Sequence, residues 1–572
     1  MDWTTRSLLW LLIIGALLPL PGAGAEDSEP LQWTAYRFRE DTSLPLNSNR
    51  GWAAGENEMA ALYYDRPFRL RLELEGSSNP SPFQELRLQF RQGEGAWQNV
   101  GVSDFPYPRF ATPPLSIVNT SAYVHGEATT DLLQGTSREH EEGMGFNGVS
   151  TTPLFSLKNE SIEWEWPLVI RRFSDGPVFA EDGETFSIRL VDTLGSPIPG
   201  VEPASSIVRA EPGHLGGTFI ETPARIGPYS SDAGNFYFLM EPTETDNRFM
   251  VVKSTDHGNS WREMDGENRP RIGDLEGVGS VYHDGIIHIL HQTSEAVYYH
   301  AFQTKDHPSG EVGWIVDSQE IARPGEPPTQ VAALTRRPDG SLVAAYGSPE
   351  KIILHLRSPE GIWKQPRTAG SEDLRGLSGC QMATDTNGVT TLVYTDAAGS
   401  GWLQTLYRDG TLTRPIRVDR PLGIQEEENG AFLPLVLPET GLPVILYRKE
   451  DGTLWERRVF PGDVLSSPVP ISQRKVVASA VDSDQVGADA IAYGDTIHLL
   501  FIEKSSRAIY HTVSEEPGVW SEPQPVVAGI DAAWIRGSLL QDAEGNPIYG
   551  FVYDAGSRGG AGLNRYFALP LD

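Results

Sequence analysis

The chain has 572 residues and a formal net charge of −31, and a surface this acidic repels nucleic acid and anionic lipid. We therefore expect no nucleic-acid partner. Its single cysteine, Cys380, excludes an internal disulfide and is expected to be a small buried hydrophobe in an inner strand. The length allows more than one domain, whose stability must come from packed β-structure.

The N-terminus has the pattern of a cleaved signal peptide. An apolar run from Leu8 to Leu20 follows Arg6, and it is short for a membrane span. Two prolines interrupt its end, and residues 23–25 (Ala-Gly-Ala) suit cleavage, which favours a leader over an uncleaved anchor. We expect residues 1–25 to be removed, leaving a secreted or periplasmic protein without an integral membrane segment.

Short alternating runs predict a β-sandwich-like N-terminal domain over residues 26–204. Residues 69–75, 86–91 and 185–191 alternate polar and apolar side chains with period 2. Such runs are typical of half-exposed strands in an antiparallel sandwich. The proline-rich stretch from Gly195 to Gly217 predicts the connection to the next domain.

Between these strands, Tyr123 to Gly148 is rich in Gly, Glu and His and is predicted to form a long loop. Its potential metal ligands lie at neither helical nor zinc-ribbon spacing, so we expect a solvated acidic loop without a metal. A structural calcium ion remains open in so acidic a chain, although no EF-hand specifies a site. The potential ligands are His125, Glu127, His140, Glu141 and Glu142.

A turn glycine followed by an apolar strand then recurs seven times at intervals of 48 to 55 residues. This is the length of a four-stranded propeller blade. Residues 205–572 are therefore predicted to form a β-propeller with seven repeats, whose closed ring hides its sheet edges. The recurring glycines are Gly234, Gly285, Gly340, Gly388, Gly441, Gly494 and Gly545.

The stretch Ser254–Trp261 predicts a turn between two strands of the first repeat. Asp256 can accept hydrogen bonds from backbone N–H groups, Gly258 can adopt positive φ, and Trp261 can cover the turn. The pattern resembles the Asp-box, or bacterial neuraminidase repeat, of the propellers found in sialidases and many secreted proteins. That resemblance places the motif on outer turns and gives Asp256 a structural role.

Several histidines recur with the architectural period, and such residues are expected to pack rather than catalyse. His288 and His498 share one position of the second strand, and His300, His355 and His511 share one position of the third. His283 is less periodic, so it remains a candidate acid or base.

Counting back from the turn glycines locates the entrances of the innermost strands, which surround the central channel. This places Arg225, Arg375 and Arg536 there as candidate ligands for a substrate carboxylate, because guanidinium groups bind carboxylates in bidentate fashion. Glu276 and Asp531 lie nearby as candidate acids or bases. In the alternative interpretation, the arginines and carboxylates only neutralise one another at the channel mouth.

The segment Ala224–Pro228 resembles the Arg-Ile-Pro motif of sialidases, which implies that Arg225 belongs to a carboxylate-binding arginine triad. Sialidases have six blades, whereas the repeats here predict seven. Tyr447 ends a periodic strand and is expected to be structural, so no residue matches the tyrosine nucleophile of that family.

Two functions remain open from the sequence. The first is a carbohydrate-active enzyme, a glycoside hydrolase or a polysaccharide lyase, that acts on an acidic extracellular glycan. The second is a non-catalytic propeller that binds glycan or protein, and fold alone does not choose between them. No nucleotide or redox cofactor is expected, because the chain lacks a glycine-rich phosphate loop and a cysteine pair.

Overall fold

The computed structural model consists of β-strands joined by turns. Among the residues that it describes, no helix is long and apolar enough to cross a membrane. The leader pattern and the candidates Glu276, Arg375 and Asp531 lie outside the described residues. The described residues are 30–41, 44–64, 66–102, 114–170, 183–209, 212–217, 219–220, 222, 224–241, 248–264, 269–270, 277–304, 313–326, 332–349, 351–370, 378–396, 398–420, 432–477, 487–530, 532, 534–554 and 564–571.

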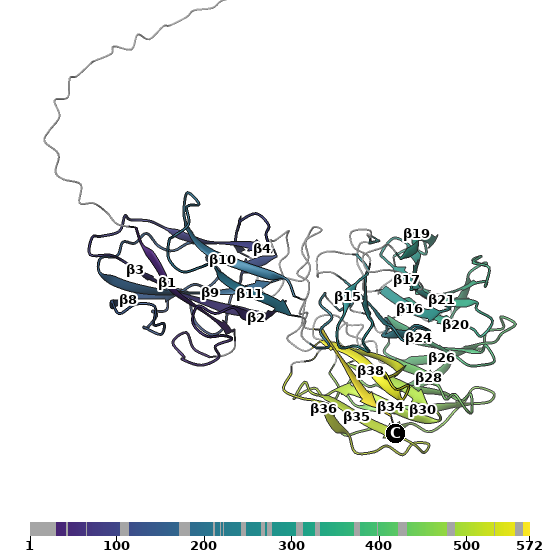
Figure 1. Cartoon of the computed structure of the whole chain (residues 1–572). Helices are drawn as coiled ribbons and strands as arrows, with labels where there is room; N and C mark the ends of the chain where they lie inside the picture. The colour runs from purple at the N-terminus through teal and green to yellow at the C-terminus, as the bar shows by residue number, and fades with distance from the viewer. Residues whose placement is uncertain are drawn as a thin grey trace, which may run out of the picture.

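The N-terminal strands are β1 (Gln32–Glu40), β2 (Ala60–Tyr63), β3 (Phe68–Glu75), β4 (Leu86–Gln92), β5 (Gln98–Asn99), β6 (Gly101–Val102), β7 (Leu115–Ile117), β8 (Glu139–Gly145), β9 (Glu160–Ile170), β10 (Thr185–Asp192) and β11 (Ala204–Arg209). They form two sheets, one ordered β1-β3-β9-β7-β6 with β8 beside β9, the other ordered β2-β11-β10-β4-β5. The strands of this domain are drawn in purple and blue in Figure 1. Leucine and aromatic side chains of both sheets share one apolar core, so the predicted sandwich is confirmed.

Two details of this domain differ from the predictions. Strand β11 lies within the stretch 195–217 that was predicted as a connection, because prolines dominate its composition while the strand itself is short. Strand β8 lies within the predicted loop 123–148 and pairs in parallel with β9. The end of this acidic segment is therefore a strand of the sheet rather than a free loop.

The prediction of half-exposed strands is confirmed for β4 and β10 and is wrong for β3. Arg69, Arg71 and Glu73 on β3 are fully buried, although they alternate with leucines as a solvent-facing row would. Backbone from distant segments covers them: Arg71 Nη2 donates to Thr130 O at 2.6 Å, and Arg69 Nη2 donates to Leu44 O at 3.1 Å. This face of the sheet is therefore a buried layer of charge.

The layer is held together by ion pairs between β3 and β9. Arg71 Nε lies 2.5 Å from Glu163 Oε2, and Arg69 Nη1 lies 3.0 Å from Glu165 Oε1. Glu73 is paired in register with Glu163, yet no cation neutralises it among the described ion pairs. Burial raises the pKa of Glu73 to about 7, because the hydrogen bond from Thr34 only partly compensates the desolvation and the neighbouring acids.

The second domain contains seven sheets in the described residues, which follow one another along the chain. The first four are β12 (Tyr229–Ser230), β13 (Phe236–Met240), β14 (Met250–Ser254) and β15 (Arg262–Glu263); β16 (Gly277–His283), β17 (Ile286–Gln292), β18 (Val297–Gln303) and β19 (Trp314–Ala322); β20 (Ala332–Arg336), β21 (Leu342–Gly347), β22 (Ile352–Arg357) and β23 (Arg367–Ala369); β24 (Ser378–Thr384), β25 (Thr390–Thr395), β26 (Gly401–Leu406) and β27 (Ile416–Asp419).

The last three sheets are β28 (Phe432–Val436), β29 (Pro443–Arg448), β30 (Leu454–Phe460), β31 (Val464–Leu465) and β32 (Val469–Pro470); β33 (Ala488–Tyr493), β34 (Thr496–Ile502), β35 (Ile509–Ser514) and β36 (Gln524–Val527); β37 (Ile535–Gln541), β38 (Pro547–Asp554) and β39 (Asn564–Pro570). Consecutive strands within each sheet pair antiparallel, as in a meander, except that β32 pairs with β30.

From β16 to β37 the first strands of these sheets contact one another in sequence, and the last of them, β37, contacts β12. The first two sheets are joined by Ser280, whose N–H donates to Arg225 O at 3.0 Å. The sheet drawn in yellow thus returns to the first sheet of the ring (Figure 1). This ring of meanders is a β-propeller, and Cys380 on β24 is buried in one of its apolar clusters as expected.

All seven recurring glycines have positive φ, between 55° and 86°. Each lies in the turn between the first and second strands of its sheet, where an L side chain would be strained. Each recurring glycine in the sequence therefore marks the turn of the hairpin formed by the first two strands of a sheet.

The stretch Ser254–Trp261 forms the predicted turn, between β14 and β15. Asp256 Oδ1 accepts from the N–H of Ser260 at 2.8 Å, and Ser254 Oγ accepts from the N–H of Gly258 at 2.8 Å. Trp261 is buried and donates to Gly258 O at 3.0 Å. Gly258 has φ 93°, and a Cβ there would meet the ring of Tyr566. Asp256 thus serves the turn, as predicted.

Four of the periodic histidines, His288, His300, His355 and His498, are buried in the sheets and His511 is half-buried, as predicted for packing residues. His288 is 8% exposed, and its Nδ1 lies 2.6 Å from the hydroxyl of Tyr299. His498 and His511 stack with ring centroids 5.4 Å apart. Burial lowers the pKa of both His288 and His511 to about 4.

Because these histidines have lowered pKa values in the folded protein, we predict that its free energy of unfolding decreases in acid. The unfolded chain binds a proton at each histidine below a pKa of about 6.5, whereas folded His288 stays neutral down to about pH 4. Stability from this group is complete above pH 6.5 and falls by roughly 2 kcal/mol towards pH 4.5. His288→Gln should reduce the difference in unfolding free energy between pH 7.5 and 4.5, measured by urea denaturation. The control is exposed His125→Gln; an unchanged difference in His288→Gln would contradict this assignment.

Candidate functional site

The first strands of the seven sheets surround a cavity of about 550 Å³. A volume of this size is typical of a small-ligand site. Every sheet contributes to the wall, which places the cavity on the axis of the ring. The lining residues are 224–225 and 228–230, 280–282, 333–335, 381–384, 432–436, 489–492 and 538–540.

Among the described residues that line the cavity, Arg225 is the one with a positively charged side chain, and this side chain is exposed. Its Nη2 donates to Ala490 O at 2.8 Å, so the side chain links the first sheet to the sixth at the cavity wall. Its backbone carbonyl accepts from both the N–H and the hydroxyl of Ser280, at 3.0 and 2.9 Å. The residue is therefore anchored through its main chain while its guanidinium faces the cavity.

Arg536, predicted to bind substrate, is instead 1% exposed and absent from the lining. Its guanidinium donates to the carbonyls of Thr222, Ala224 and Ile535, and two of these precede β12. Arg536 thus joins the last sheet to the first. The prediction was wrong because Arg536 lies on an inner strand, as expected, but points into the sheet interface. The corrected role is structural.

His283, the remaining predicted site residue within the described parts of the chain, does not line the cavity. His283 ends β16 beside Gly340, and its side chain is not in the lining. Burial and then the charge of Arg336 lower its pKa. Among the residues that the structure describes, Arg225 is therefore the one predicted site residue that lines the cavity.

Asp489 is a lining residue that the sequence reasoning missed. It lies on β33, is 3% exposed, and its Oδ2 accepts from Tyr549 Oη at 2.7 Å and from Gly537 N at 3.0 Å. Burial raises its pKa, although the charges of Arg225 and Arg536 and these hydrogen bonds oppose the rise. A lone carboxylate in the apolar run Ala488–Ala492 was the available signal. Counting back from Gly494 passed over it and stopped at Gln485.

Apart from Arg225 and Asp489, the cavity wall contains aromatic rings and uncharged hydrogen-bonding groups. Tyr229 and Tyr282 stack with centroids 6.0 Å apart, and Tyr229 Oη lies 2.9 Å from Ser280 Oγ. Burial raises the pKa of Tyr229 to about 12, so its hydroxyl is protonated at neutral pH. Gln381 Nε2 has no hydrogen-bond partner within the described part of the chain, and Gln381 lines the cavity.

The electrostatics of this cluster favour an anion. Arg225 and Arg536 supply two positive charges around the single carboxylate of Asp489, whose ionised form is disfavoured by burial. The described cluster is therefore positive by at least one charge, within a chain whose net charge is −31. The Arg225 guanidinium at the cavity wall can bind a carboxylate through charge-assisted hydrogen bonds.

No protein-family model and no curated protein matches the sequence. Solved structures with a similar arrangement include the BP39L lectin from Burkholderia pseudomallei, with 12% identity and a TM-score of 0.42, covering 61% of this chain and 99% of that one. A polysaccharide lyase of family PL25, an ulvan lyase, has 10% identity and a TM-score of 0.42, covering 63% and 95%. The Aleuria aurantia lectin has 12% identity and a TM-score of 0.35, covering 53% and 95%. At these identities and TM-scores the matches carry no argument about function, so we infer the chemistry of the cavity from its own residues.

Proposed function

We propose that this protein binds an acidic saccharide in the central cavity, with Arg225 holding the carboxylate of the sugar. The observation that carries the proposal is the position of Arg225: its guanidinium is exposed at the cavity wall and makes one hydrogen bond, to Ala490 O, with described residues. A guanidinium has five N–H donors, so most of its capacity is left for a ligand.

The rest of the wall suits a sugar ring. Stacked Tyr229 and Tyr282 offer aromatic surface for the apolar face of a pyranose, and Gln381 and Ser280 offer groups for its hydroxyls. Thr335 and Thr384, whose hydroxyls lie 3.1 Å apart, add a further pair. These contacts would orient the saccharide, while the charge of Arg225 selects an acidic one.

We also propose that the protein works outside the cytoplasm, on an extracellular glycan. The apolar N-terminal run followed by a small-residue cleavage site supports export, and the low cysteine content is compatible with it. The resemblance of Ala224–Pro228 to the sialidase motif supports the assignment of a carboxylate to Arg225. This resemblance covers the carboxylate-binding arginine of sialidases but not their tyrosine nucleophile.

Catalysis is a second candidate, favoured by Asp489. A buried carboxyl group with a raised pKa is suited to donate a proton to a glycosidic oxygen. Tyr549, which hydrogen-bonds to Asp489, is fully buried and outside the lining, so it orients the carboxyl group rather than attacking a substrate. Incubation with polyuronates and sialosides, followed by analysis of released products, separates catalysis from binding alone.

The binding proposal predicts a charge-specific loss in Arg225→Gln. Trigalacturonate should bind about 10- to 100-fold more weakly to this variant, because a shielded charge-assisted pair contributes ~1.5 to 3 kcal/mol. The fully methyl-esterified trisaccharide has nearly the same shape without the charge, so its affinity should be equal in both proteins. Isothermal titration calorimetry measures both, with sialyllactose and lactose as the arm that separates sialic acids from uronates.

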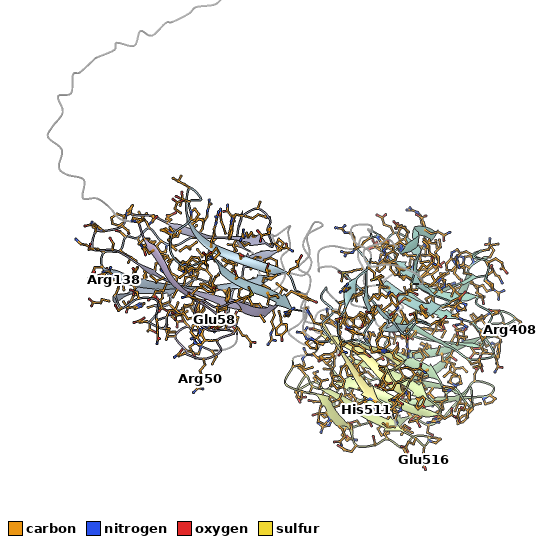
Figure 2. The ribbon with its side chains drawn as sticks, in the orientation of Figure 1. Arg50, Glu58, Arg138, Arg408, His511 and Glu516 are labelled. Carbon is orange, nitrogen blue, oxygen red and sulfur yellow. The ribbon has the colours of Figure 1, made fainter. Side chains whose placement is uncertain are left out.

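Arg408→Gln is the matched control, because Arg408 is an exposed arginine at the outer edge of the propeller (Figure 2). It should bind trigalacturonate or sialyllactose as the parent does. Equal affinity of the parent and Arg225→Gln for the acidic saccharides, or no binding of either by the parent, would refute the proposal.

A further inference from the structure

Three potential metal ligands meet beside the buried charged layer of the N-terminal domain. Asp131, His140 and Glu163 each place a carboxylate oxygen or a ring nitrogen within 4.8 Å of the others. His140 lies on β8 and Glu163 on the adjacent strand β9, while Asp131 belongs to the segment that covers the layer. The ligands are brought together by the parallel pairing of β8 with β9, which the sequence spacing does not reveal.

The ring of His140 is prepared to ligate a metal. Its Nε2 lies 3.2 Å from the carbonyl oxygen of Thr129, to which it can donate a hydrogen bond. The other ring nitrogen, Nδ1, is the acceptor of that tautomer of the neutral ring, and it is buried without a hydrogen-bond partner among the described residues. A ligating histidine typically donates its second nitrogen to a backbone carbonyl in this way, which fixes the tautomer and the ring orientation.

A further buried acid, Glu73, lies directly across from Glu163 on β3. Glu73 is fully buried, and its Oε2 accepts from Thr34 Oγ1 at 3.0 Å. Its Oε1 has no hydrogen-bond partner in the described parts of the chain. Burial of a carboxylate oxygen without a donor costs several kcal/mol unless a cation or a proton compensates it.

The charge balance of the buried layer is compatible with a bound divalent cation. The three buried arginines Arg39, Arg69 and Arg71 form ion pairs with Asp41, Glu163 and Glu165, which balances these six groups. Glu73 and Asp131 then remain as two acidic groups outside the described ion pairs. One divalent cation beside them would neutralise the cluster.

Glu163 retains capacity for a metal bond. Its Oε1 accepts from the N–H groups of Leu132 and Leu133, both at 2.7 Å, and its Oε2 accepts from Arg71. A carboxylate has about four lone-pair sites, so one remains after these three hydrogen bonds. The same bonds hold the segment that carries Asp131 against the sheet.

We propose that Asp131, His140 and Glu163 bind one divalent metal ion of the Zn²⁺ or Mn²⁺ class, beside the buried acid Glu73. Mixed imidazole and carboxylate ligands favour these ions over Ca²⁺, which prefers oxygen ligands alone. The ion would tie the covering segment and β8 to β3 and β9. It lies in a different domain from the saccharide cavity, so either proposal can fail without the other.

The test uses the full chain, freed of metal with a chelator, and isothermal titration calorimetry with Zn²⁺ or Mn²⁺. One ion should bind per chain and raise the melting temperature. Asp131→Asn, at an exposed position that leaves the fold intact, should weaken binding at least 10-fold. His140→Ala should do the same.

The matched controls are His125→Ala and Glu142→Gln, which remove an exposed imidazole and an exposed carboxylate from the same segment. Both should bind the ion as the parent does. No binding by the parent, binding that Asp131→Asn and His140→Ala leave unchanged, or binding of Ca²⁺ in preference to Zn²⁺ and Mn²⁺ would each overturn the proposal. Circular dichroism of every variant confirms that the fold is retained.

Discussion

Replacing Arg536 by methionine is expected to lower the unfolding free energy of the propeller by about 3 to 5 kcal/mol. The fully buried guanidinium donates to the carbonyls of Thr222, Ala224 and Ile535, and its charge opposes that of Asp489. Methionine fills a similar volume but donates no hydrogen bond to these carbonyls. It also removes a positive charge that stabilises the buried carboxylate of Asp489. Because Arg536 joins the last sheet to the first, the loss falls on the closure of the ring.

Urea denaturation followed by tryptophan fluorescence measures this loss, since Trp534 lies two residues from Arg536 in the same sheet interface. Arg408→Met provides the control, because it removes an exposed arginine with the same substitution (Figure 2). A loss below about 1 kcal/mol in Arg536→Met would show that the ring closes without this residue.

Arg71→Met is expected to destabilise the N-terminal domain by a similar amount, about 3 to 5 kcal/mol. Arg71 is fully buried and pairs with both Glu163 and Glu165, at 2.5 and 3.3 Å. Its removal leaves two carboxylates beside Glu73 without that cation. The melting temperature of the domain, measured by scanning calorimetry, should fall accordingly.

The double variant Arg71→Met with Glu163→Gln separates charge from packing. The glutamine carbonyl can still accept from Leu132 N and Leu133 N, while the unpaired negative charge is gone. It should therefore recover at least about 1 kcal/mol relative to the single variant. If the double variant is the less stable of the two, repulsion among the buried acids is not what Arg71 relieves.

The architecture was accessible from the sequence because its signals are local. The turn glycines need only their own backbone conformation, and all seven have the positive φ that their recurrence indicated. The turn at Ser254–Trp261 is likewise closed by its own residues, through Asp256 and Gly258. Periodic histidines such as His288 are buried for the same architectural reason.

The buried charged layer was not accessible, because its burial depends on segments far away in the chain. Strand β3 alternates charged and apolar residues like any strand with one wet face. Only the backbone near Leu44 and Thr130 turns that face into an interior, and no local pattern records the contact. The approach of Asp131 to His140 and Glu163 has the same origin.

The candidate site was predictable in part. Arg225 was identified by its place before the first sheet and by its motif, and it lines the cavity. Arg536 was predicted on the correct strand. The direction of its side chain depends on whether backbone carbonyls or the cavity lie opposite, and residue spacing in the sequence does not determine this. Asp489 was missed because the distance from the turn glycine to the strand entrance differs between sheets.

The most direct measurement is a crystal structure of the full chain with bound trigalacturonate or, if that arm binds, sialyllactose. The account predicts the saccharide in the central cavity, with a sugar carboxylate within hydrogen-bonding distance of the Arg225 guanidinium and a ring against Tyr229 or Tyr282. A saccharide bound elsewhere on the protein, or in the cavity with its carboxylate away from Arg225, would contradict it.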